Sequence, residues 1–165
     1  MDFARSTARA MHDDHMATLQ LLARLEARIA LCVDGNIPDT GEPEWRRLLS
    51  EFSAAVRDEV SGHFGFEEAS LFPILRQAGE EEMCRLLEEQ HAELLPLGMR
   101  LADLAGDAAL EGFTQEGWAE FRTGSATFID GLRAHVDIEE ASMVPALEDA
   151  LEADQDFELI QAYRP

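Results

Sequence analysis

Aliphatic residues recur at helical spacing along nearly the whole chain. Two such runs are Leu19, Leu22, Leu25, Ile29 and Leu94, Leu97, Leu101, Leu104. Residues three or four positions apart lie on one face of a helix, so both runs predict amphipathic helices. The sequence has no period-2 stretches rich in Val, Ile and Tyr, which would predict strands. The pattern therefore predicts an all-α fold.

Breaks in this pattern divide the chain into long helices. Glycine and proline mark breaks at 34–38, at Gly79 and from 106 to 114. We expect helices over residues 6–33, 43–77, 80–105 and 115–149, and a short C-terminal helix over 154–163. Pro43 suits a first helical turn, whereas Pro73, Pro96 and Pro145 should bend their helices. Because the connections are short, we expect an up-down-up-down antiparallel four-helix bundle in a single domain, 1–165.

The two halves of the chain resemble each other. HFGFEEASLFPIL (63–75) aligns with HVDIEEASMVPAL (135–147), and the two segments share His, two Glu, Ala, Ser, Pro and Leu. HMATLQLLARL (15–25) aligns with HAELLPLGMRL (91–101), and these segments share His, three Leu and Arg. The chain is therefore predicted to be two fused helical hairpins, which would pair about a pseudo-twofold axis.

The charge of the chain excludes several classes of partner. Thirteen Lys and Arg residues against 34 Asp and Glu residues give a formal net charge of -21. Such a surface repels nucleic-acid phosphates and anionic lipid headgroups, so we expect neither as a partner. The longest apolar run, 29–33, is far below the about 18 to 20 residues of a spanning helix, and the first residues lack a secretory apolar segment. We expect a soluble, cytoplasmic protein with Cys32 and Cys84 as buried, reduced thiols.

Four histidines carry the candidate chemistry, one on each predicted long helix and related in pairs by the repeat: His15, His63, His91 and His135. Glu67 and Glu139 follow His63 and His135 by one helical turn and share their helical faces. Any one of these histidines alone could be an ordinary core residue. Burying all six groups without partners would be costly, and a pair of metal ions would remove that cost.

A bundle has room for two such ions. Neighbouring helix axes lie about 8–10 Å apart, which accommodates two cations about 3.5–4 Å apart. We assign His15 and His63 to one ion, His91 and His135 to the other, and Glu67 and Glu139 as bridges between them. These donors suit iron, manganese, cobalt or zinc better than copper(I) or calcium. An oxo, hydroxo or water bridge and an exchangeable position would complete each shell.

Other polar and aromatic residues near this set have separate interpretations. His12 and Glu88, each three residues before a helix-1 or helix-3 histidine, are candidate auxiliary ligands, although His12 also fits a solvated residue. Glu68 and Glu140 point about 100° away from the bridging glutamates and should face solvent or a neighbouring helix end. Four phenylalanines should be core residues that also help to exclude water: Phe64, Phe66, Phe72 and Phe128.

The sequence resembles the hemerythrin-like (HHE cation-binding) family. Its pattern is a histidine on helix 1, H-x-x-x-E on helix 2, a histidine on helix 3 and H-x-x-x-E on helix 4, which here is His15, His63/Glu67, His91 and His135/Glu139. The resemblance covers nearly the whole chain and implies a non-haem di-iron centre bridged by two carboxylates and an oxygen atom. Oxygen-carrying hemerythrins have a second helix-3 histidine, where this chain has Leu87 and Leu95.

Four histidines make the set closer to the iron-sensing and iron–sulfur-repair branches of the family, although the cysteine-containing extension typical of the repair proteins is missing. Glu88-x-x-His91 is also similar to half of the signature of ferritin-like di-iron proteins, but His12 stands where helix 1 would repeat its glutamate. A ferritin-like arrangement is therefore disfavoured.

We therefore expect a di-iron protein that senses, binds or sequesters oxygen, nitric oxide or iron itself, with zinc or manganese as possible substitutes. The alternative is a redox protein that repairs iron–sulfur centres or removes peroxide or nitric oxide, which would need an electron-donor partner. The chain has no nucleophile elbow or phosphate loop, so the binding role is preferred over an enzymatic one.

Overall fold

The computed structural model describes residues 3–32 and 36–163, and every regular element in these ranges is helical. This confirms the predicted all-α class. The elements in chain order are α1 (Ser6–Ala30), α2 (Pro43–Ala54), η2 (Ala55–Val60), α3 (Ser61–Phe66), η3 (Glu67–Leu71), α4 (Phe72–Gln77), α5 (Glu81–Glu111), α6 (Gln115–Ile138), η4 (Glu139–Met143), α7 (Val144–Ala150) and α8 (Ala153–Tyr163). The η elements are π-helical, with wider turns than an α-helix.

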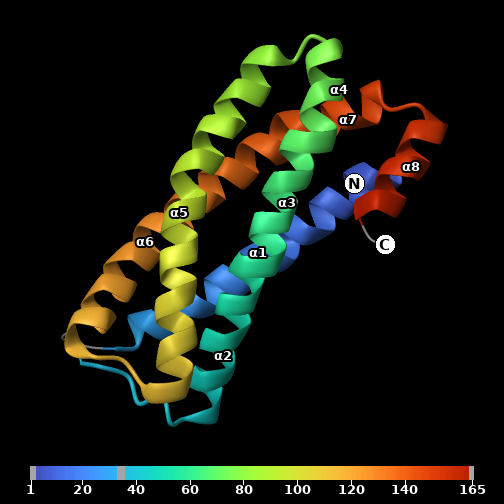
Figure 1. Cartoon of the computed structure of the whole chain (residues 1–165). Coiled ribbons are helices and arrows are strands. Elements are labelled where there is room, and N and C mark those ends of the chain that lie inside the picture. Colours follow the sequence, from blue (N-terminus) through green and yellow to red (C-terminus); the bar gives the residue numbers. More distant parts are fainter. Residues whose placement is uncertain (1–2, 33–35, 164–165) are drawn as a thin grey trace.

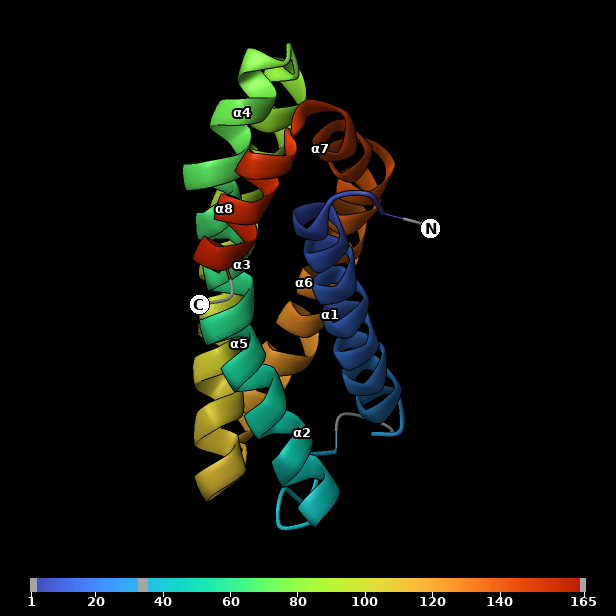
Figure 2. The same cartoon turned by 90° about the vertical axis from the view of Figure 1, so that its right-hand side faces the viewer.

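These elements join into long rods that lie side by side (Figures 1 and 2). The segment from α2 to α4 forms one rod, and the segment from α6 to α7 forms another. Successive rods run in opposite directions, and α8 folds back to contact α1 (Figure 1). No helix in the described ranges is long and apolar enough to cross a membrane.

Several helix ends differ from the prediction. The third helix was predicted to end at 105, but α5 continues to Glu111. The helix continues through Gly106. A Cβ there would lie 3.2 Å from Ser53 Oγ, so the glycine allows α5 to pack closely on α2. The chain turns at Gly112 instead, whose φ of 88° favours glycine. The first helix ends at Ala30, short of the predicted 33, and residues 33–35 of the predicted break lie outside the described ranges.

Two prolines follow widened turns. The N–H of Phe72 donates to the carbonyl of Glu67, and the N–H of Val144 donates to that of Glu139, each five residues back. Pro73 and Pro145 come next, and a proline lacks the N–H that a regular helix needs and crowds the carbonyl four residues earlier. A π-helical turn suits that position. The hydrophobic spacing does not predict these turns, which begin at the two candidate bridging glutamates.

The core consists of two hydrophobic clusters with a polar layer between them. One cluster is rich in aromatic rings, and Phe52 packs edge-on against Phe121 and Phe128. The other cluster gathers the aliphatic residues of α4 and α7, the start of α5 and the first turns of α1. Along α5, Leu87 belongs to the second cluster and Leu94 to the first, with buried His91 between them. The histidines therefore lie in a layer enclosed from both ends.

Two side chains predicted to be buried are only partly buried. Both cysteines are free thiols, but Cys32 is partly exposed because it follows the end of α1, whereas Cys84 is buried. Phe66 is also partly exposed and packs against Tyr163, with 4.6 Å between ring centroids. The other three phenylalanines predicted for the core are buried.

The start of α1 is capped by residues from the other end of the chain. Arg5 offers no side-chain cap, so the first N–H groups need other acceptors. Asp156 of α8 accepts hydrogen bonds from the backbone N–H groups of Ser6 and Thr7, both at 2.8 Å. Glu148 of α7 accepts from the N–H groups of residues 4 and 5, both at 2.9 Å. The bonds to Asp156 hold α8 against the start of α1, and those to Glu148 hold α7 against the residues that precede it.

Candidate metal centre

The structure brings all six predicted ligand side chains into the polar layer, and all are buried. They form two groups that share both glutamates: His15, His63, Glu67, Glu139 and Glu67, His91, His135, Glu139. In each group, one nitrogen or oxygen atom from every residue lies within 4.8 Å of the others. The histidines fall into the same two pairs that the sequence analysis assigned to two ions.

Each glutamate reaches both groups. Glu67 Oε1 lies 3.0 Å from His63 Nε2 on the same rod, and Glu67 Oε2 lies 3.2 Å from His91 Nε2 on α5. Glu139 does the same on the other side, with 2.9 Å to His135 Nε2 and 3.0 Å to His15 Nε2. One carboxylate oxygen therefore points to each group, as bridging requires.

Two further glutamates hold histidines from outside, which the sequence analysis missed. Glu140 Oε1 lies 2.6 Å from His15 Nδ1, and Glu68 Oε1 lies 2.8 Å from His91 Nδ1. Both had been expected to face solvent or a neighbouring helix end. Their rotation away from the bridging glutamates instead directs them to the outer nitrogen of a histidine on the adjacent helix. The doubled Glu-Glu in both repeats was the available sequence signal.

The other two histidines have different outer partners. His135 Nδ1 lies 2.9 Å from Gln90 Oε1. His63 Nδ1 lies 3.0 Å from the hydroxyl of Tyr163, which itself donates to Asp14 Oδ2 at 2.5 Å. Sequence reasoning found none of these three partners, and Tyr163 has no local signal because it lies 100 residues from His63.

These contacts fix which nitrogen of each neutral histidine carries hydrogen. Carboxylate and amide oxygens only accept, so His15, His91 and His135 donate from Nδ1. Since the phenol gives its hydrogen to Asp14, its oxygen accepts from His63 Nδ1. When the four imidazoles are neutral, each therefore turns an unprotonated Nε2 inward, which is the form that binds metal.

In this form the four inner nitrogens donate no hydrogen bonds. Among the described residues, all four carboxylate oxygens of Glu67 and Glu139 are buried without a hydrogen-bond partner. They nevertheless lie about 3 Å from the histidine Nε2 atoms. Bare nitrogens facing carboxylate oxygens in a buried layer repel one another unless cations lie between them. The residues present thus fit a pair of metal ions.

Without cations, the pKa values of the two buried glutamates shift in opposite directions. Burial and the neighbouring Glu139 raise the pKa of Glu67 to about 8. Burial alone would raise the pKa of Glu139 too, but the neighbouring His135 and His15 hold it well below its ordinary value. The two carboxylates therefore keep one proton between them at neutral pH.

The pKa values of the first histidine pair shift in opposite directions. Burial lowers the pKa of His63, which keeps it neutral. Burial alone would also lower the pKa of His15, but the nearby carboxylate of Glu139 raises it above the ordinary value. Because metal ligands must be deprotonated, metal binding would release the proton that the two carboxylates share.

The two candidate auxiliary ligands do not join the site. His12 Nδ1 lies 2.7 Å from Glu140 Oε2, and 28% of its side chain is exposed. Glu88 Oε2 lies 2.7 Å from a guanidinium nitrogen of Arg76. Neither belongs to the two groups of potential ligands. His12 instead supports the outer carboxylate that holds His15.

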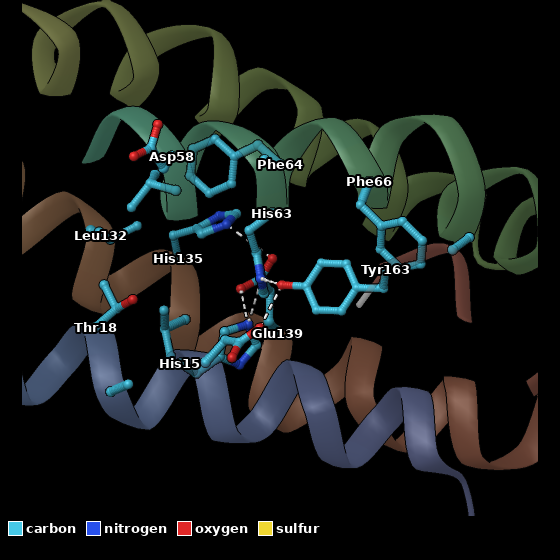
Figure 3. A pocket seen from close by; sticks show the side chains of 16 residues that line it. His15, Thr18, Asp58, His63, Phe64, Phe66, Leu132, His135, Glu139 and Tyr163 are labelled. Atoms are coloured by element: carbon cyan, nitrogen blue, oxygen red, sulfur yellow. Dashed lines mark hydrogen bonds and ion pairs between the residues drawn. The ribbon is translucent and has the colours of Figure 1, made fainter. Parts of the chain in front are cut away.

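A cavity of about 550 Å³ lies beside the His15 and His63 pair (Figure 3). Its wall combines Thr18 and Tyr163 with the apolar side chains of Phe64, Leu132 and Val136. The second pair is more enclosed. His135 borders the cavity, but His91 does not, and Phe64 stacks on His91 with 3.8 Å between ring centroids.

Comparison with known proteins agrees with this geometry. Residues 6–147 match the family model of the hemerythrin HHE cation binding domain. No curated protein and no solved structure matches the chain. The matched range contains all six potential ligands and ends before α8. Because the match covers nearly the whole chain, this protein belongs to the hemerythrin HHE cation-binding family.

Proposed function

We propose that the polar layer holds two iron ions as a non-haem di-iron centre. His15 and His63 would bind one ion, His91 and His135 the other, and Glu67 and Glu139 would bridge them. The observation that carries this proposal is the set of inward-facing Nε2 atoms and buried carboxylate oxygens without hydrogen-bond donors. Nitrogen and oxygen donors suit iron, and they also allow zinc or manganese to occupy the site.

The outer contacts support an internally duplicated four-helix centre. Glu68 on one rod holds His91 on the next, and Glu140 on the fourth rod holds His15 on the first. The two bonds are equivalent under the repeat of the sequence. Such partners orient a ligating imidazole and increase its basicity.

We infer that the centre binds a small diatomic ligand, oxygen or nitric oxide, at the ion of His15 and His63. Two imidazoles and two carboxylate oxygens leave this ion below six ligands, and the cavity opens beside its histidines. Bound iron would supply the redox-active position for the ligand. Phe64, Leu132 and Val136 would limit the water that competes for it.

Metal analysis tests the first part of this proposal. After anaerobic reconstitution with Fe(II) and desalting, we expect about two iron ions per chain, as in other binuclear sites. The double variant His15→Gln/His63→Gln should retain about one, whereas His12→Gln should retain both. A wild-type chain without tightly bound metal would refute the di-iron centre, and equal loss in His12→Gln would refute the assignment of ligands.

Nitric oxide titration of the reduced protein tests the second part. We expect one equivalent to bind at the cavity-facing ion, followed by absorption and electron paramagnetic resonance. Thr18→Leu should weaken or slow this binding, because the larger side chain fills part of the cavity wall. Equal binding in both proteins would contradict entry through this cavity. Repeated consumption of nitric oxide or peroxide with an added reductant would favour the redox alternative.

A further inference from the structure

The C-terminal helix α8 lies outside the range that matches the family, yet its last residue contacts the candidate metal centre. We propose that Tyr163 is a positioning residue for His63, which makes α8 part of the centre and gives the two ions different stabilities. This inference rests on the proposed metal binding by His63.

The hydroxyl of Tyr163 lies between His63 and Asp14 and makes a hydrogen bond with each. Its hydroxyl accepts from His63 Nδ1 at 3.0 Å and donates to Asp14 Oδ2 at 2.5 Å. Its ring packs against Phe66, so the hydroxyl points toward His63 from the side of the cavity (Figure 3). A hydroxyl that makes both bonds fixes the ring orientation of His63 and keeps its Nε2 free for a metal.

The position of α8 is set at its other end. Asp156 accepts the hydrogen bonds of two N–H groups at the start of α1, and Thr7 Oγ1 donates to the carbonyl of Asp156 at 3.3 Å. Helix α1 also carries Asp14 and His15. The same helix therefore anchors α8 and supplies the acceptor for its tyrosine, so Tyr163 is held in register with the site.

The sequence repeat shows what Tyr163 adds. Asp14 precedes His15 as Gln90 precedes His91, so the two residues occupy equivalent positions. In the second half, Gln90 bonds His135 directly through a neutral amide oxygen. In the first half, the bond to His63 runs through a phenol to a carboxylate. An acceptor backed by a carboxylate makes the imidazole a stronger metal ligand than a neutral amide does.

A comparison of Tyr163→Phe with Gln90→Leu tests this inference. Both variants remove one outer acceptor and keep a side chain of similar size. The probe is Co(II), loaded to saturation and then removed by excess chelator while the visible absorption is followed. We expect Tyr163→Phe to accelerate the loss of one ion by about 10- to 100-fold and Gln90→Leu to accelerate the loss of the other. Asp14→Asn should affect the same ion as Tyr163→Phe, by a smaller factor.

Proton NMR of the Co(II) protein supplies a spectroscopic readout. Each ligating imidazole gives an exchangeable, paramagnetically shifted Nδ1–H signal. Tyr163→Phe should move or broaden one such signal and leave the other three, which general destabilisation would not do. Equal acceleration of both ions, or four unchanged signals, would overturn the role of Tyr163. A wild-type chain that takes up no cobalt would instead refute the metal centre itself.

Discussion

The two halves of the candidate centre have the same ligand types but different surroundings. His15 and His63 border a cavity, whereas His91 lies under the stacked ring of Phe64 and does not reach it. Phe72 also lies nearly parallel to His91, at an interplanar angle of 19° and 5.8 Å between centroids. The first half is therefore suited to admit a ligand, and the second half to hold an ion in a closed environment.

One substitution between the repeats and one residue outside them distinguish the two halves. Thr18 lines the cavity in the first half, and the repeat places Leu94 at the equivalent position in the second half, where it is buried. Tyr163 supports His63, whereas Gln90 supports His135. The comparison teaches that the ligand set can remain duplicated while neighbouring side chains make one half accessible.

Removing a candidate bridging glutamate should have the largest effect on metal content, because it removes a ligand from both halves. Glu67 and Glu139 each direct one oxygen to either group. We expect Glu67→Ala or Glu139→Ala to lose most of both ions, measured by elemental analysis after reconstitution. Glu88→Ala is the control, because this partly exposed glutamate lies outside both groups of potential ligands, and it should retain both ions. Retention of one full ion in either bridge variant would show that the carboxylate serves only one half.

Truncating Phe64 should open the closed half. The ring is 3% exposed, lines the cavity and stacks on His91. Phe64→Ala should extend the cavity to His91 and lower the free energy of unfolding by about 3–5 kcal/mol. Chemical denaturation measures the stability, and azide titration of the oxidised iron protein counts accessible ions. An increase from one azide to two is expected, and an unchanged count would show that another group closes this half.

The outer carboxylates should have equal effects on opposite halves. Glu140→Gln weakens the support of His15, and Glu68→Gln weakens that of His91. Each variant should reduce the affinity of one ion by about 10- to 100-fold, measured by competition with a chelator. His12 contacts only the Glu140 side. A larger effect of Glu140→Gln would therefore indicate that His12 contributes through that carboxylate.

The smallest expected effect concerns the attachment of α8. Asp156→Asn should lower the free energy of unfolding by about 0.5–2 kcal/mol, as loss of a helix cap does. Burial alone would raise the pKa of Asp156, but the N–H groups of Thr7 and Ser6 hold it below its ordinary value of 3.8. Its stabilisation is thus present above pH 3.8 and disappears as the pH falls through the lowered value.

Denaturation of both proteins across pH checks this prediction. The difference in stability should be constant near neutrality and shrink under acid conditions. A difference that grows toward low pH would contradict the assigned sign. If α8 positions Tyr163, Asp156→Asn should also accelerate metal loss from the His63 half alone.

Much of the fold could be predicted because it depends on local periodicity. The rod over residues 43–77 has the predicted limits, and α8 begins one residue before its predicted start. The positions of His63 and Glu67 on one helical face follow from their spacing, and the repeat extends the argument to His135 and Glu139. The hydrophobic spacing did not predict the π-helical turns, two of which directly precede prolines. It also did not predict that α5 continues through Gly106, because that depends on the packing of α5 against α2.

The sequence by itself determined the helical class, the acidic charge, the repeat and the set of six residues placed on inward faces. These properties follow from spacing along one helix at a time. Only the tertiary structure decided which outer nitrogen each partner holds, which half borders a cavity, and that Tyr163 reaches His63 from the end of the chain. Those features join side chains far apart in sequence, whose meeting is set by how helices pack rather than by the period of any one helix.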